Sequence, residues 1–178
     1  TRTDVANSRE VDALFAEISR RWDGLDVLVN NAGVAGPTAP VEDISDADWE
    51  RTFAVNLHGM FYCTRRAVPL LKRAGGGSIV NLSSSAGRFG FALRTPYAAS
   101  KWGVVGFTQS LAIELGPANI RVNAILPGVV AGERQERVIA AKAKAIGISA
   151  EEQRERLLSK VSLRRMVSAQ DIANMILF

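Results

Sequence analysis

Segments with apolar residues at helical spacing alternate along the chain with short, nearly continuous apolar runs. This pattern predicts alternating helices and strands. Residues 8–22 carry apolar side chains at helical spacing behind Asn7, which predicts an amphipathic helix capped by Asn7. Nearly continuous apolar runs at 25–30, 78–83 and 120–126 predict three strands buried on both faces. Periodic segments at 45–71 and 95–115 predict one long helix between each pair of strands, the second with Thr95 as N-cap and Pro96 as its first residue.

The order of these elements predicts the fold class. Strand, helix, strand, helix and strand at even spacing indicate an α/β fold with a doubly wound parallel sheet of the Rossmann type. Ligands of such sheets bind at the carboxyl ends of the strands. The three predicted strands end in NNAG (30–33), SSSAG (83–87) and PGVV (127–130), so we expect a site at that edge.

Beyond the third strand the pattern becomes wholly helical. Two amphipathic segments, 132–147 and 149–161, are separated by Gly147, and a last helix is expected to begin at Ser168. Residues 129–168 are therefore expected to form a helical substrate lid within a single domain, 1–178. No strand follows the last helix, so the sheet is expected to be open at this end.

Composition and charge narrow the classes of function. The chain has 178 residues, of which 47% are hydrophobic and 22% charged, as in an ordinary globular domain. The net charge is +4, but there is no long basic run, so nucleic acid is not expected as a partner. No apolar run is long enough to span a membrane. Cys63 is the only cysteine, which excludes an internal disulfide and a cysteine metal cluster and favours a reducing compartment such as the cytoplasm.

Tyr97 and Lys101 are the strongest chemical signal. They lie four residues apart in a predicted helix and so project from one face. A phenol ordinarily holds its proton too tightly for acid–base work at neutral pH, but a nearby ammonium favours the phenolate. Alone, the pair is better explained as a surface contact. The serines at 83–85, at a predicted strand end, favour catalysis because a hydroxyl there can hold a substrate oxygen.

These motifs together resemble those of the short-chain dehydrogenase/reductase family, in its ordinary single-domain branch. The resemblance covers essentially the whole chain, and NNAG favours this branch over the longer nucleotide-sugar epimerases, which also carry Tyr-x-x-x-Lys. The matching residues keep the family's order and spacing: Asp4–Val5, NNAG at 30–33, Asn56, SSSAG at 83–87, YAASK at 97–101 and Pro127–Gly128.

The resemblance implies four catalytic residues. Tyr97 would be the acid–base, and Lys101 would support it and bind the nicotinamide ribose. Ser84 would hold the substrate oxygen. Asn56 would hold a water in a proton relay toward Lys101; alternatively, it satisfies backbone groups in a helix bend. The implied cofactor is NAD or NADP, and no metal is expected. The further cofactor-binding residues would be Asp4, Val5, Asn30, Ala32, Gly33, Pro127, Gly128 and Val130.

Two departures from the family pattern change the expectations. Ala131 and Gly132 stand where the family usually has a threonine that contacts the nicotinamide. No segment matches the glycine-rich turn that receives the pyrophosphate, because GGGS (75–78) precedes a strand and is expected to be a loop. The domain is therefore expected to be an internal portion of a longer protein, incomplete at both ends and weak in cofactor binding when made alone.

The expected function is NAD(P)-dependent interconversion of a small secondary alcohol and a ketone by a homo-oligomer, a dimer or tetramer. Two alternatives stay open: a reductase of 3-oxoacyl thioesters on an acyl carrier protein, and a non-catalytic binding member of the family. His58, Cys63 and Trp102 are expected to be structural. The lid arginines are expected to be solvated, with one or two facing an acidic substrate; they are Arg134, Arg137, Arg154, Arg156, Arg164 and Arg165.

Overall fold

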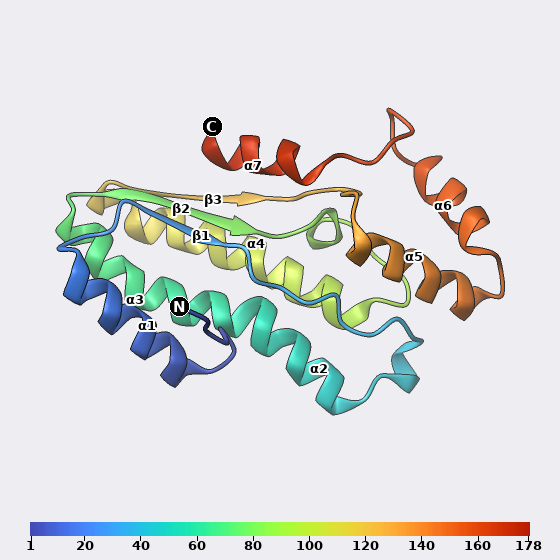
Figure 1. The fold of residues 1–178 in the computed structure, drawn as a ribbon, viewed down its shortest axis with the longest axis horizontal. Helices are drawn as coiled ribbons and strands as arrows, with labels where there is room; N and C mark the ends of the chain where they lie inside the picture. Colours follow the sequence, from blue (N-terminus) through green and yellow to red (C-terminus); the bar gives the residue numbers. More distant parts are fainter.

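A three-stranded parallel sheet forms the centre of the molecule (Figure 1). The computed structural model describes all of residues 1–178. Its strands are β1 (Val27–Asn30), β2 (Gly77–Leu82) and β3 (Ile120–Ile125), and β2 lies between the other two. Val80 pairs with both Val29 and Asn123, so the strands run in register and end at one edge. The predicted parallel sheet of an α/β fold is confirmed.

Helices pack mainly on one side of this sheet. Figure 1 shows α1 and α3 on that side, α7 on the opposite side, and α5 with α6 beyond the carboxyl end of β3. The helices are α1 (Ser8–Arg21), α2 (Asp46–Phe53), α3 (Gly59–Arg73), α4 (Thr95–Leu115), α5 (Glu133–Ile146), α6 (Ala150–Leu158) and α7 (Ala169–Leu177). Short helical turns lie at η1 (Val41–Asp43), η2 (Ala54–His58), η3 (Ser85–Gly87) and η4 (Gly116–Ala118).

The hydrophobic core lies between the sheet and the helices α1, α3 and α4. Side chains from α1 meet those of α3 and α4 over the central strand, because α1 and α3 turn their apolar stripes inward and α4 is apolar around most of its surface. The fully buried members of this cluster include Val11, Ala67, Leu71 and Ile79. This core fixes the directions of β2 and α4, the two elements that carry the serines and the Tyr-x-x-x-Lys pair.

The prediction that each strand is buried on both faces is correct for β2 and wrong for the outer strands, β1 and β3. Val27 and Val29 of β1 are 51% and 39% exposed, because they point to the face of the sheet opposite Leu28, which packs against the core. In β3 the burial alternates, with Arg121 and Asn123 exposed. The apolar runs predict burial on both faces for all three strands, but only β2 lies in the centre of the sheet.

Two helix predictions also need correction. The long helix expected over 45–71 is continuous through α2 and α3, but it contains a π-helical turn, η2, that accommodates an extra residue around Asn56. Helix α4 begins at Thr95 with Arg94 in the cap position, so Thr95 is not the N-cap and Pro96 is the second helical residue. The cap predicted at Asn7 and the helix start predicted at Ser168 are confirmed by side-chain bonds to backbone amides, and Ser45 and Ser149 cap α2 and α6 in the same way.

Candidate active site

The three serines after β2 have different environments. The hydroxyl of Ser83 is buried and donates to the Lys101 backbone carbonyl at 2.8 Å, which ties the strand end to helix α4. The hydroxyl of Ser84 accepts from the Ala86 amide at 3.2 Å, so its own proton is available to a ligand. Ser85 begins the turn η3 and donates its amide to the Pro127 carbonyl at 2.9 Å. Of the three, Ser84 is best placed to hold a substrate oxygen.

Gly87 allows the serine turn to approach helix α4. A Cβ atom at this position would lie 2.5 Å from the Ser83 hydroxyl and 2.6 Å from the Lys101 carbonyl. Both distances are too short for real side chains, so the close contact requires glycine. The SSSAG motif is thus explained by the packing of β2 against α4 as well as by chemistry.

Lys101 is held in place by a carbonyl at the end of β2. Its side chain is 4% exposed, and its ammonium donates to the Leu82 carbonyl at 2.7 Å. Burial, together with the positive charge of Arg134, lowers the pKa of Lys101 to about 8 from its ordinary value of 10.5. Because an ammonium has three donors, this bond leaves donors for a ligand in the pocket.

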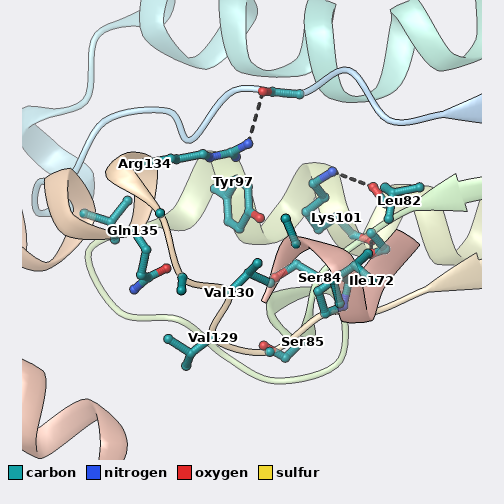
Figure 2. Close-up of a pocket in the computed structure, with 18 of the residues that line it drawn as sticks. Leu82, Ser84, Ser85, Tyr97, Lys101, Val129, Val130, Arg134, Gln135 and Ile172 are labelled. Carbon is teal, nitrogen blue, oxygen red and sulfur yellow. Dashed lines mark hydrogen bonds between the residues drawn. The ribbon is translucent and has the colours of Figure 1, made fainter. Parts of the chain in front are cut away.

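Tyr97 is surrounded by cations. The guanidinium of Arg94 lies 4.9 Å from the centre of the Tyr97 ring, and the Lys101 ammonium lies 5.9 Å from it. The guanidinium of Arg134 is 6.0 Å away, and Figure 2 shows it beside the ring. Three positive charges therefore surround the phenol that would carry negative charge after giving up its proton.

Asn56 is completely buried in the π-helical turn η2 and binds two other segments. Its amide accepts from the Val34 amide at 2.7 Å, and donates to the Val34 carbonyl at 3.1 Å and to the Ser100 hydroxyl at 3.0 Å. Ser100 in turn donates to the Tyr97 carbonyl at 2.8 Å. This geometry matches the structural alternative for Asn56, and its part in a proton relay stays a prediction.

A pocket of about 400 Å³ at the carboxyl end of the sheet brings most of the predicted residues together (Figure 2). Its walls come from the loops after all three strands, from α4, and from α5, α6 and α7. The residues predicted for the site that line it are Gly33, Ser84, Tyr97, Lys101, Pro127, Gly128 and Val130. The edge predicted from the strand ends is therefore the edge where the structure forms a pocket.

Other predicted residues lie outside this pocket. Val5, Asn30 and Ala32 line a second hollow of about 350 Å³ beside the open edge of β1. The Asn30 amide is buried and donates to Asn81 at 2.8 Å and to Thr64 at 3.1 Å, so its side chain serves the fold. Asp4 is not frayed, since its carboxylate accepts from the Ala6 amide at 3.0 Å. Their roles in cofactor binding stay predictions.

The sequence pattern does not indicate that two arginines line the pocket. Arg94 stands just before the Thr-Pro start of α4 and is 2% exposed, although nothing in its neighbours' pattern predicts a buried charge. Arg134 is the lid arginine that lines the pocket, and its guanidinium donates to the Gly33 carbonyl at 3.3 Å. Gly132 provides the left-handed backbone that turns α5 toward the pocket, with φ of 139°.

A family model for Enoyl-(Acyl carrier protein) reductase matches residues 1–178, the whole chain. The chain belongs to the short-chain dehydrogenase/reductase family. Members of this family are NAD(P)-dependent oxidoreductases, so the expected fold and class of enzyme are confirmed.

Relatives and solved structures agree with this family assignment. Galactitol 2-dehydrogenase from Agrobacterium fabrum is 38% identical over 178 residues, which are 99% of this chain and 69% of that protein. Trans-4-hydroxycyclohexanecarboxylate dehydrogenase from Sinomonas cyclohexanicum is 47% identical over 127 residues, 71% of this chain and 48% of that protein. A 3-oxoacyl-(acyl-carrier-protein) reductase from Thermotoga maritima is 35% identical, covering 98% of this chain and 66% of that protein.

Two solved structures carry the cofactors of the family. An NAD+-bound xylitol dehydrogenase matches with a TM-score of 0.94 and 30% identity, over 99% of this chain and 70% of that one. An actinorhodin polyketide ketoreductase with NADPH matches with a TM-score of 0.91 and 35% identity, over 98% of this chain and 67% of that one. NAD or NADP is thus the cofactor of this family, and the chain spans about two thirds of these proteins.

The pocket fits the nicotinamide end of such a cofactor. A Cβ atom on Gly33 would lie 3.6 Å from the Lys101 ammonium and 3.2 Å from the Asn56 amide oxygen, so the glycine keeps the approach to Lys101 open. The remaining donors of Lys101 suit ribose hydroxyls, and the backbone of 127–130 forms the opposite wall. Lys101 and Pro127 to Val130 would therefore hold the nicotinamide riboside in this family member.

We expect the Lys101 ammonium to titrate near pH 8 in the cofactor-free protein. Between pH 8 and 10.5 the Lys101 side chain is protonated in the unfolded chain and deprotonated in the folded chain. Its contribution to the free energy of unfolding therefore rises with pH in that window and is lost as the pH falls to 8. NMR of side-chain-labelled lysine measures the titration. Replacing Arg134 with glutamine should raise the value, while Arg137→Gln on the same helix should not; a Lys101 midpoint above pH 10 would contradict the expectation.

The chain has neither a cluster of metal-ligating side chains nor a helix that could span a membrane. No group of three or more His, Cys, Asp or Glu side chains is arranged to hold a metal ion. None of the helices is both long and apolar enough to cross a bilayer.

Proposed function

We propose that this protein interconverts a secondary alcohol and a ketone, with Tyr97 as the acid–base and NAD or NADP as cofactor. The observation that carries the proposal is the convergence of Tyr97, Lys101 and Ser84 on one pocket at the carboxyl end of the sheet (Figure 2). The dehydrogenases among the relatives support it. The cofactor supplies or accepts the hydride, and the chain supplies position and proton transfer.

Each side chain has a distinct part in this chemistry. The Ser84 hydroxyl would donate to the substrate oxygen, since its lone pair already accepts from the Ala86 amide. The Tyr97 phenol would take the alcohol proton in oxidation and return it in reduction. Lys101, fixed on the Leu82 carbonyl, would hold the ribose and stabilise negative charge on Tyr97.

A panel of alcohols tests the proposal. The purified protein is mixed with NAD or NADP and with polyols, hydroxysteroids and hydroxycycloalkane carboxylates, classes on which relatives are named as acting. Growth of the reduced-nicotinamide absorbance with a secondary alcohol is the expected result. Tight cofactor binding without turnover of any alcohol or ketone would instead favour a non-catalytic binding member.

A 3-oxoacyl thioester reductase is the second candidate, supported by the relative from Thermotoga maritima. An acidic carrier protein would need free positive charge on the lid. Two lid arginines are already paired, Arg154 with Glu136 and Arg156 with Glu152. Their charge is thus partly neutralised, which counts against a contact with an acidic carrier protein at these two positions.

We propose residues 129–168 as the substrate lid. The two ends of this segment are joined by the Ala131 amide, which donates to the Val167 carbonyl at 2.8 Å.

The buried cysteine suits a reducing compartment. Cys63 lies in the core between α3 and α1, and burial raises the pKa of its thiol. A thiol in this state is a poor nucleophile and has no partner for a disulfide. We propose the cytoplasm as the location of the protein on this basis.

We expect a dimer or tetramer built on α3 and α4. Apolar side chains on these helices face solvent, with Phe61 41%, Trp102 52% and Ile113 82% exposed. Such surface is costly unless another copy covers it. Light scattering should show the oligomer, and Phe61→Glu should shift it toward monomer, whereas Phe89→Glu in the loop after the serine turn should not. A wild-type monomer at micromolar concentration would contradict the expectation.

A further inference from the structure

The pocket carries positive charge without any acidic residue to balance it. Arg94, Lys101 and Arg134 line it, and no aspartate or glutamate does. Lys142 adds a fourth cation nearby, with its ammonium 5.0 Å from the centre of the Phe91 ring. None of the four has a carboxylate within ion-pair distance, so the imbalance is a property of the pocket.

Arg94 is the most unusual of these groups because it is both charged and almost wholly buried. One terminal nitrogen donates to the Ala35 carbonyl at 2.6 Å, while Nε and Nη1 are buried without any hydrogen-bond partner. The guanidinium lies 5.6 Å from the Phe91 ring and 4.9 Å from the Tyr97 ring. Burying a guanidinium without a counter-ion has a large desolvation free energy, and contacts with aromatic faces offset only part of it. A negatively charged group in the pocket would offset more of it.

Arg134 is the cation best able to meet such a charge directly. It is exposed at the start of α5, and its single hydrogen bond, to the Gly33 carbonyl, is long at 3.3 Å. Its guanidinium lies on the same pocket wall as the Tyr97 ring, 6.0 Å from the ring centre. A substrate whose carbinol group reaches Tyr97 could therefore place a second group at Arg134.

The rest of the lining describes the body of that substrate. Apolar side chains of Phe91, Val138, Leu157 and Ile172 line the pocket together with the cations. Arg94 is too deeply buried to touch the surface of a partner protein. The pocket thus suits a small molecule with a hydrocarbon body, an alcohol at one end and a negative charge at the other.

We propose that the substrate is a secondary alcohol that bears an oxyanion group, a carboxylate or a phosphate, bound by Arg134 and stabilised by the buried charge of Arg94. The inference rests on the proposed function, because it names the substrate class of the same site. A bidentate contact of Arg134 with the oxyanion supplies orientation as well as attraction. The neutral analogue would leave Arg94 without its counter-charge.

Equilibrium binding tests the inference without requiring turnover. The probes are cyclohexanecarboxylate, cyclohexyl phosphate and the neutral cyclohexanecarboxamide, titrated by calorimetry into the protein with NAD or NADP present. At least one anion should bind about tenfold or more tightly than the amide. Arg134→Gln should remove that preference, while Arg137→Gln, the same charge change one turn along α5 and outside the pocket, should keep it. Equal binding of the amide and both anions would overturn the inference.

Kinetics separate this inference from the proposed function. With 4-hydroxycyclohexanecarboxylate and its amide as substrates, the carboxylate should have the higher kcat/KM, and Arg134→Gln should lower the ratio about tenfold. Turnover of both at equal kcat/KM would overturn the oxyanion site and leave the oxidoreductase intact. A preference for the anion that survives in Arg134→Gln, with cofactor affinity lost instead, would assign Arg134 to the cofactor and also overturn the inference.

Discussion

Replacing Tyr97 with phenylalanine should lower kcat by about 10²–10⁴-fold, the usual contribution of a positioned acid–base group. The phenyl ring keeps its contacts with Arg94 and Lys101, so the fold and the pocket should persist. Only the hydroxyl that exchanges a proton with the substrate is lost. Steady-state turnover with the best alcohol of the panel measures the change, and thermal unfolding verifies the fold.

The matched control for this variant is Tyr62→Phe. Tyr62 is the only other tyrosine; it lies on α3, against Phe61 and outside the pocket. Its loss of a hydroxyl should leave kcat near the wild-type value. Activity of Tyr97→Phe at the level of Tyr62→Phe would remove Tyr97 from the chemistry and leave the pocket without an acid–base.

Replacing Gly87 with alanine should lower the free energy of unfolding by about 1–3 kcal/mol, the usual cost of overpacking. The new methyl group would lie within 2.6 Å of the Ser83 hydroxyl and the Lys101 carbonyl, so either the serine turn or α4 must move. Movement of either displaces Ser84 from Tyr97 and Lys101. Activity should therefore fall together with stability, as measured by chemical denaturation and by turnover.

Gly90→Ala is the control for this prediction. Gly90 lies three residues further along the same loop, and a Cβ atom there meets nothing within 4 Å. Its stability should stay within about 0.5 kcal/mol of the wild type, as for an ordinary surface substitution. If Gly87→Ala were as stable and as active as Gly90→Ala, the close packing of the serine turn on α4 could not be what positions the site.

The sequence predicts the parallel sheet and the gathering of the strand-end motifs near Tyr97 and Lys101 because both depend on the order and local pattern of the elements, whereas the choice of Ser84 among the three serines rests on the family resemblance. The carboxyl ends of parallel strands share an edge, so motifs that follow β1, β2 and β3 must gather there. A spacing of four residues on a helix likewise fixes Tyr97 and Lys101 on one face whatever the tertiary structure. These predictions needed no knowledge of neighbouring elements.

The rest depends on contacts between distant segments. The burial of Arg94 is set by the Ala35 carbonyl, 59 residues away, and by the rings of Phe91 and Tyr97. The π-helical turn η2 within the predicted long helix accompanies the bonds of Asn56 to Val34, 22 residues away. Hydrophobic periodicity carries no information on either contact, because both are made by polar groups across the fold.

Transfer of isotope from substrate to cofactor tests the central claim most directly. A secondary alcohol with deuterium on its carbinol carbon, chosen from the active members of the panel, is oxidised with unlabelled NAD or NADP. The account predicts that the deuterium appears on the nicotinamide ring of the reduced cofactor, detected by mass spectrometry and NMR, and that Tyr97→Phe slows its appearance. Reduced cofactor that carries only hydrogen from the solvent, or no reduced cofactor with any alcohol or ketone tested, would contradict it.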